Sequence, residues 1–265
     1  MITTKKINQY IERIPPAPKA LKETLSFLNN GELTKASHVA QNDPALSRYL
    51  RELVNKPIYG FTNEISDISQ IFGILGVSGS QQSVYNYMTT LLSPEKWVLF
   101  KLDARKFHEL QARLSKNWET ILKHLNIEDK DISTSISLLP ASIIVTEALF
   151  CEKIDDVTLL RGVKKIDYNT ILYRLSGIGI FDICEQISKK WEMSEKVSNI
   201  IQASSGTKPS TDENTNRLGK WMHLLLFYEL SKPLFIEAGL NDFIDFHIEY
   251  VSDIYEEFAT LMEIS

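Results

Sequence analysis

The stretch DPALSRYLRELVNKPIYG, residues 43–60, contains the pattern from which the fold class follows. Asp43 can accept hydrogen bonds from the first helical turn, and Pro44 loses none there because its missing N–H would have had no partner. Asn55 to Gly60 then forms a natural break between helices. Between these signals, apolar residues recur at spacings of three and four at Leu46, Leu50, Leu53 and Val54. The stretch predicts a capped helix followed by a tight turn.

Similar signals repeat along the rest of the chain. Gly76 is expected to end one helix, and Ser194 to begin another. Further helices are expected over residues 66–75, 80–92, 104–125, 168–175 and 181–191. The last helix is expected to be the most regular, with one apolar face formed by Ile244, His247, Val251, Ile254, Phe258 and Leu261. No run of alternating strand residues competes with these patterns, so the predicted fold class is all-α.

The Ser-rich stretch 203–211 is the clearest candidate for a flexible segment. It lies between the main body of the chain and a final pair of helical segments. We therefore expect a helical domain over residues 10–206 and a C-terminal helical extension over residues 207–265 that packs on it.

Composition limits the classes of function. The 265 residues are 43% hydrophobic and 24% charged, values typical of a folded soluble chain. The net charge of −5 does not favour binding to nucleic acid, and none is expected. Two cysteines, Cys151 and Cys184, cannot form a disulfide framework, which favours a reducing, cytoplasmic setting. The most apolar window, residues 141–150, is short and contains Glu147, so no membrane insertion is expected.

Several short motifs occur in a characteristic order and spacing. They are Ile14-Pro15-Pro16-Ala17-Pro18, Asn42-Asp43-Pro44-Ala45-Leu46, Val54-Asn55, Ile58-Tyr59-Gly60, Ile65-Ser66 and Phe72-Gly73-Ile74-Leu75-Gly76. Their order resembles the HDOD family, bacterial signalling and regulatory domains related to the HD-type metal phosphohydrolases. The resemblance is strongest over residues 10–90 and continues to about 206 through Trp191. The residues that carry it have structural roles, as helix caps, turns and packing positions: Pro15, Pro16, Asp43, Pro44, Asn55, Tyr59, Gly60, Gly73, Leu75 and Gly76.

The resemblance also indicates where a metal site would lie. The catalytic relatives hold metal ions with His and Asp side chains, beginning with an adjacent His-Asp pair. No His-Asp pair occurs in this sequence, whose five histidines are His38, His108, His124, His223 and His247. At the family's ligand positions, the alignment implied by the resemblance places Pro140 and Ala141, then Ile180, then Ser204 and Ser205. These side chains are apolar or coordinate metals weakly, so we expect no metal, no cofactor and no catalytic residue.

Two functions follow from this resemblance. The favoured one is a non-enzymatic signal-transduction module that acts by binding an unnamed signalling protein and carries a degenerate HD metal site. The alternative is a metal-dependent phosphohydrolase acting on a nucleotide or cyclic dinucleotide through ligands of another kind. A nucleic-acid-binding regulator is a weaker third possibility, which the net charge opposes.

Overall fold

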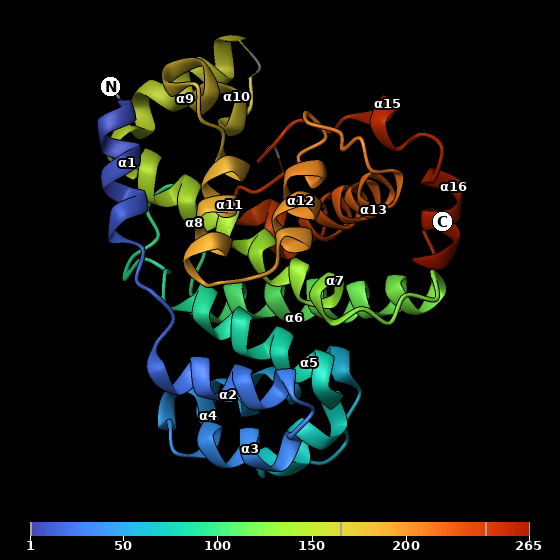
Figure 1. The fold of residues 1–265 in the computed structure, drawn as a ribbon. Helices are drawn as coiled ribbons and strands as arrows, with labels where there is room; N and C mark the ends of the chain where they lie inside the picture. The colour runs from blue at the N-terminus through green and yellow to red at the C-terminus, as the bar shows by residue number, and fades with distance from the viewer. Residues whose placement is uncertain (1, 165, 242, 265) are drawn as a thin grey trace.

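The structure, a computed structural model, describes residues 2–164, 166–241 and 243–264. Every regular element in this part of the chain is helical, which confirms the all-α prediction. The helices form a smaller lobe built from α2 to α5 and a larger one built from α8 to α16 (Figure 1). α6 and α7 lie between the two lobes (Figure 1), and one continuous apolar core extends through both.

The smaller lobe contains α2 (Lys19–Asn29), α3 (Leu33–Gln41), α4 (Pro44–Val54) and α5 (Ile68–Thr90), with the short 3₁₀ helix η1 (Pro57–Tyr59). Asp43 caps α4, because its Oδ1 accepts the N–H groups of Ala45 and Leu46, each at 3.0 Å. Asn55 then ties the end of α4 to the chain before α5. Its amide exchanges two hydrogen bonds of 2.9 Å with the backbone of Ile65. The Asn55 amide thus fixes the turn that separates the two helices.

Gly76 interrupts α5 without ending it. Its φ of 65° and ψ of −173° lie outside the helical region, while the residues on either side continue as one helical element. The sequence predicted a stop at this glycine and a new helix from residue 80. The non-helical residue is at the predicted position, but the gap between the two helical segments is shorter than expected.

The larger lobe is built around α8 (Leu139–Phe150), most of whose residues are buried. It follows α6 (Ala104–His124), α7 (Lys130–Ser135) and the 3₁₀ helix η2 (Ile136–Leu138). The helices after it are η3 (Cys151–Lys153), α9 (Ile154–Lys164), α10 (Tyr168–Ser176), α11 (Ile180–Lys190) and α12 (Glu195–Ser204). α11 packs on both α8 and α12, and α12 also packs on α7.

The chain enters this lobe at its N-terminus through α1 (Thr4–Arg13), which contacts α11. Lys190 Nζ donates to the carbonyl oxygens of Ile11 at 2.6 Å and Glu12 at 3.0 Å, close to the C-terminal end of α1. Trp191 Nε1 donates to the Pro15 carbonyl at 3.2 Å. The proline-containing segment after α1 is therefore attached to the end of α11.

The helical run Lys130–Val163 is long and apolar enough to span a membrane by length and composition. The sequence analysis had expected no window of that length. Pro140 is the second residue of α8, which follows η2 directly, and it does not break the run because a proline in the first turn of a helix loses no backbone hydrogen bond. Within the fold, 89% of the most apolar window is buried, as in a core helix.

The C-terminal part contains α13 (Glu213–Leu230), α14 (Pro233–Glu237), α15 (Ile248–Val251) and α16 (Tyr255–Leu261). α13 packs on α12 and α6. The prediction of a single long helix at the C-terminal end is wrong, because two short helices, α15 and α16, lie there. The backbone N–H of His247 donates to the His223 ring at 3.2 Å instead of bonding within a helix, and only four residues of α15 follow.

Candidate functional site

The five positions that the sequence resemblance aligns with HD ligands all lie in the interior of the larger lobe. Pro140 and Ala141 belong to the first turn of α8, and Ile180 is the first residue of α11. Ser204 ends α12, and Ser205 is its C-cap. All five are buried. α11 contacts both α8 and α12, so it joins the elements that carry these positions.

The polar atoms at these positions are used within the fold. Ser204 Oγ donates to the carbonyl of Ile201 and Ser205 Oγ to that of Gln202, both at 2.7 Å. The N–H of Ile180 donates to Asn169 Oδ1 at 2.8 Å. The sequence predicts a flexible segment from residue 203, but the structure places Ser204 in the last turn of α12 and Ser205 at its C-cap.

A cavity of about 360 Å³ opens beside these positions, at the N-terminal end of α11. The residues that line it come from α10, α11, α12 and the loop after α12. They are Asn169, Thr170, Tyr173, Arg174, Gly179, Phe181, Asp182, Gln202, Ser205, Thr207 and Lys208. Among the degenerate positions, Ser205 lines this cavity. Pro140, Ala141, Ile180 and Ser204 are not among its described lining residues.

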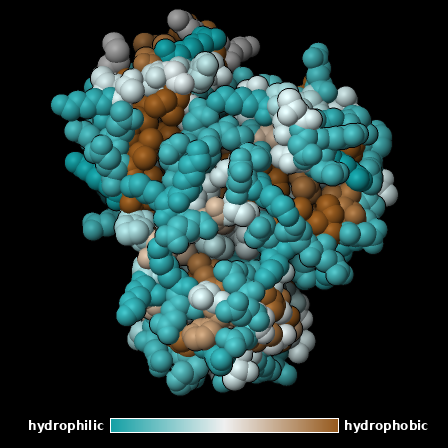
Figure 2. All heavy atoms as spheres, in the orientation of Figure 1, coloured by the Kyte–Doolittle hydropathy of each residue, from teal (hydrophilic) through white to brown (hydrophobic). Residues whose placement is uncertain are grey.

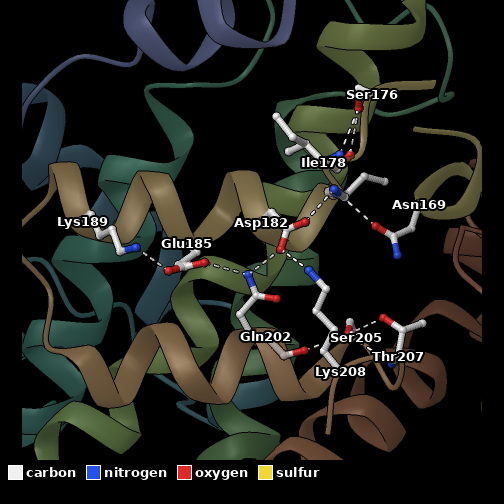
Figure 3. Close-up of polar contacts among 12 residues, drawn as sticks. Asn169, Ser176, Ile178, Asp182, Glu185, Lys189, Gln202, Ser205, Thr207 and Lys208 are labelled. Atoms are coloured by element: carbon white, nitrogen blue, oxygen red, sulfur yellow. Dashed lines mark hydrogen bonds and ion pairs between the residues drawn. The ribbon is translucent and has the colours of Figure 1, made fainter. Parts of the chain in front are cut away.

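Asp182 is at the centre of a polar network on one side of this cavity (Figure 3). Its Oδ1 accepts from Lys208 Nζ at 2.6 Å and from Gln202 Nε2 at 3.0 Å. Its Oδ2 accepts the N–H of Gly179 at 2.7 Å and so caps the first turn of α11. Gln202 Nε2 also reaches Glu185 Oε2 at 2.9 Å. The carboxylate therefore joins α11, the end of α12 and the following loop.

The surroundings of Asp182 keep it ionised. Burial by itself would raise the pKa of this carboxyl group. The hydrogen bonds from Lys208, Gly179 and Gln202, together with the charge of Lys208, outweigh burial and hold the pKa below its usual value. Asp182 thus carries a negative charge that Lys208 already neutralises.

This arrangement does not fit a catalytic metal ion. A metal site requires several His, Cys, Asp or Glu side chains directed at one point. No group of three or more such residues is placed to hold a metal ion within residues 2–164, 166–241 and 243–264. Both oxygens of Asp182 already accept hydrogen bonds from groups of the protein.

The five histidines do not gather at this cavity. His38 is exposed. His108 Nδ1 lies 3.6 Å from Glu52 Oε2, and His124 Nε2 lies 2.7 Å from Glu257 Oε1. His223 and His247 do meet, with ring centroids 5.8 Å apart. Their contact joins α13 to the loop before α15, a non-local relation that helical periodicity does not reveal.

Sequence reasoning also missed the polar network. Asp182 lies three residues after Gly179, a spacing typical of a capping side chain, and this local signal could have identified its role in the turn. Its partner Lys208 is 26 residues later in the sequence, in the loop that follows α12. That pairing becomes visible only when α11 and α12 are packed together.

Comparisons with known proteins agree with this architecture. The model of the HDOD domain matches residues 14–206, and no curated protein matches the chain. A solved HDOD domain protein with unknown function from Geobacter sulfurreducens is 12% identical. It has a TM-score of 0.63, with 98% of this chain and 95% of that chain covered.

Two further solved structures show the same fold at low identity. One is described as a "Putative phosphohydrolase" from Shewanella amazonensis, with 16% identity, a TM-score of 0.65 and 97% of each chain covered. The other is described as a "Putative signal transduction protein" from Marinobacter aquaeolei. It has 16% identity and a TM-score of 0.65, and the match covers 98% of this chain and 63% of that one. Because the family model matches more than half of the chain, this protein belongs to the HDOD domain family.

Proposed function

We propose that this protein is a non-enzymatic regulatory module of bacterial signal transduction that acts by binding a partner protein. One observation carries the proposal. The positions that would supply metal ligands in a catalytic relative hold buried side chains, and the two serine hydroxyl groups among them bond to backbone carbonyls of α12. A function that needs no metal at these positions is compatible with this arrangement.

The neighbouring charged groups support the same proposal. A carboxylate that acts as a general acid or base must lie within hydrogen-bond reach of the substrate proton that it transfers. Asp182 instead accepts from three groups that hold the first turn of α11 to α12 and to the loop at Lys208. Its side chain therefore has a structural role that chemistry at this position would disturb.

A cytoplasmic setting is part of the proposal. Cys151 and Cys184 are free thiols. Burial raises the pKa of Cys184 far above its usual value, which keeps this thiol protonated and unreactive. Both observations are compatible with a reducing compartment.

The phosphohydrolase remains the second candidate because of the charges around the cavity at α11. Lys208 and Arg174 both line it, and cationic side chains are suited to binding phosphate oxygens. A hydrolase would have to recruit Asp182 after release from Lys208. This alternative therefore makes Asp182 essential to catalysis, whereas the favoured proposal makes it structural.

An activity screen separates the two. The purified chain is incubated with Mn²⁺, Fe²⁺, Zn²⁺ or Mg²⁺ and with nucleoside phosphates or cyclic dinucleotides, and product is measured by chromatography. The matched variants are Asp182→Asn and Glu195→Gln, the latter on the exposed first turn of α12. We expect no turnover by any of the three proteins. Turnover that Asp182→Asn abolishes and Glu195→Gln retains would overturn the proposal.

Partner binding is tested directly in the native cell. The tagged chain is purified under mild conditions, and the masses of its complexes are measured by native mass spectrometry. We expect a complex of fixed stoichiometry that forms again when the separated components are mixed. A protein that purifies alone from its native cells at every stage of growth would contradict the proposal.

A further inference from the structure

We propose that the cavity between α9, α13 and the C-terminal segment binds an organic cation with an apolar body. This cavity has a volume of about 1030 Å³, close to the upper limit of the range expected for a small-molecule site. The described residues that line it differ from those at the α11 cavity. The inference goes beyond the proposed function, because it assigns a ligand to a second region of the molecule.

The walls of this cavity are mainly apolar and aromatic. Five aromatic side chains from α13, the loop before α15 and α16 line it: Phe227, Tyr228, Phe246, Tyr255 and Phe258. The ring centroids of Phe227 and Phe246 lie 4.9 Å apart, so the two rings form one continuous surface. Phe246 and Tyr255 are 41% and 43% exposed, so both rings are accessible from solvent.

Apolar side chains also reach the surface in this part of the molecule. On the face shown in Figure 2, most of the surface is hydrophilic, and one of the separate apolar areas lies over the region of α13 to α16. Aromatic faces attract cations as well as apolar groups. Lys232, which lines the same cavity, already uses this attraction, since its Nζ lies 3.5 Å from the centre of the Tyr228 ring.

Two carboxyl groups, Asp167 and Asp245, line the cavity together with the basic side chains of Arg161 and Lys232. Asp167 is buried and caps α10, with its oxygens accepting from Thr170 N at 3.0 Å and Thr170 Oγ1 at 2.6 Å. Asp245 lies beside it from the loop before α15, and both residues line the cavity. Two adjacent carboxyl groups bind a proton or another cation more readily than one group alone.

The pKa of Asp245 agrees with this geometry. Partial burial, the charge of Asp167 and the hydrogen bond to Asp167 raise the pKa of Asp245 above its usual value. His247 and Arg161 act in the opposite direction and do not offset these effects. Arg161 lies over the Tyr168 ring at 4.2 Å, and its Nη1 donates to Tyr168 Oη at 3.0 Å. A ligand ammonium or guanidinium group beside Asp245 would reduce the repulsion between its carboxylate and that of Asp167.

The charge preference is tested with three small probes of similar shape on the full chain, at 150 mM salt. Titration calorimetry compares the 2-phenylethylammonium ion, neutral 2-phenylethanol and the phenylacetate anion. We expect the cation to bind roughly ten times more tightly than the alcohol, because a hydrogen bond to a charged group replaces a neutral one. Equal binding of the alcohol, tighter binding of the anion, or no binding of the cation would overturn the proposal.

Two variants locate the binding. Asp245→Asn removes the charge of an exposed side chain, and we expect it to weaken binding of the cation roughly tenfold while leaving the alcohol unchanged. Glu249→Gln is the matched control, an exposed carboxylate on α15 that does not line the cavity. A folded Asp245→Asn protein that binds the cation like the wild type, or an equal loss in both variants, would contradict the assignment.

A final comparison identifies the source of the cation. The blocked peptide acetyl-Gly-Arg-Gly-amide presents the same charge on a protein side chain. Binding of the free amine alone supports a small-molecule ligand, and binding of the peptide as well supports a basic side chain of a partner. Failure of both overturns the inference and leaves the proposed regulatory function standing, because that function rests on the residues around α11.

Discussion

His223 is a fully buried imidazole whose two ring nitrogens both have backbone partners. Nδ1 lies 2.9 Å from the carbonyl of Ser204, and Nε2 accepts the N–H of His247 at 3.2 Å. This pattern requires a neutral ring with its proton on Nδ1. Burial is the main reason that the pKa of His223 falls to about 4, and the nearby His247 lowers it further. The ring thus connects the end of α12 to the loop before α15 only while it is uncharged.

We predict that His223 makes the protein less stable in acid. Its pKa is about 4 when folded and about 6.5 when unfolded, so between these values the unfolded chain binds the extra proton. Its contribution is complete above pH 6.5 and is lost as the pH falls towards 4, by up to about 3 kcal/mol. Urea unfolding of the wild type and His223→Gln at several pH values measures this loss.

The two unfolding curves should converge as the pH falls through this window, and a variant at the exposed His38 should follow the wild type. Free energies of the wild type and His223→Gln that change in parallel between pH 7 and 4 would contradict the assignment of a neutral buried ring.

We predict that Asp182→Asn lowers the free energy of unfolding by about 1–2 kcal/mol at pH 7, because it removes a charged capping side chain. Its pKa is lower in the folded protein than in the unfolded chain, so its contribution is present above about pH 4 and lost as the pH falls further. Thermal unfolding measures the difference. Glu195→Gln is the control, and equal stability of all three proteins at pH 7 would exclude the capping role.

These residues show which contacts the sequence could predict. Asp43 and Asn55 act on backbone groups within about ten residues, so residue type and spacing were sufficient. Asp182 and Lys208 are 26 positions apart, and His223 and His247 are 24 apart. Their contacts depend on how α11, α12 and α13 pack, which no local pattern encodes.

At the level of the helix, Gly76 and Gly73 form a matched pair within α5. A side chain would have open space at either position, so the difference between them is one of backbone conformation. Gly76 has a φ of 65° and a ψ of −173°, a combination almost restricted to glycine. Gly73 lies within the helix at ordinary φ.

We therefore predict opposite effects of alanine at these two positions. Gly76→Ala should destabilise the protein by about 1–3 kcal/mol because of backbone strain. Gly73→Ala should stabilise it by about 0.5–1 kcal/mol because alanine loses less entropy in a helix. Chemical denaturation of both variants tests this. Equal effects in the two would indicate that the break in α5 is absent in solution.

The C-terminal segment shows where helical periodicity fails as a predictor. Residues 244–261 have an apolar repeat that suits one long helix, yet Phe243 and Ile244 are buried in a loop and α15 spans four residues. The apolar residues of this segment are buried from a loop and two short helices instead of from one long helix. The N–H of His247 bonds to the His223 ring, so it takes no part in a helix at this point. Tertiary contacts here override the local pattern.

At the scale of the whole molecule, Glu229 attaches the C-terminal extension to the main body. Its side chain on α13 is completely buried. One oxygen accepts from Arg113 Nε and the other from Asn117 Nδ2, both at 2.6 Å and both from α6. Gly219 allows a second close approach, since a Cβ there would lie 2.5 Å from that of Ala203 on α12. The extension thus packs directly on α6 and on α12, the helix that ends at Ser204.

We predict that Glu229→Gln lowers the free energy of unfolding by about 2 kcal/mol, since Arg113 loses its buried charge partner while remaining partly open to solvent. Hydrogen exchange of the backbone amides in α13 should also be faster in the Glu229→Gln variant than in the wild type. Glu109→Gln is the control, because that carboxylate lies 3.9 Å from Arg113 Nη1 and is more exposed. We expect a change of about 0.5 kcal/mol or less in the control. Similar losses in the two variants would show that α13 is held by other contacts.

The measurement that tests the central claim most directly is the metal content of the full chain after incubation with Mn²⁺, Fe²⁺ or Zn²⁺ and removal of excess ion. Pro140, Ala141, Ile180, Ser204 and Ser205, which the resemblance to the HDOD family aligns with metal-ligand positions of the catalytic relatives, are all buried. We predict far less than one equivalent of any metal, determined by plasma mass spectrometry. One or two equivalents that are retained by the wild type and lost in Asp182→Asn would contradict the account.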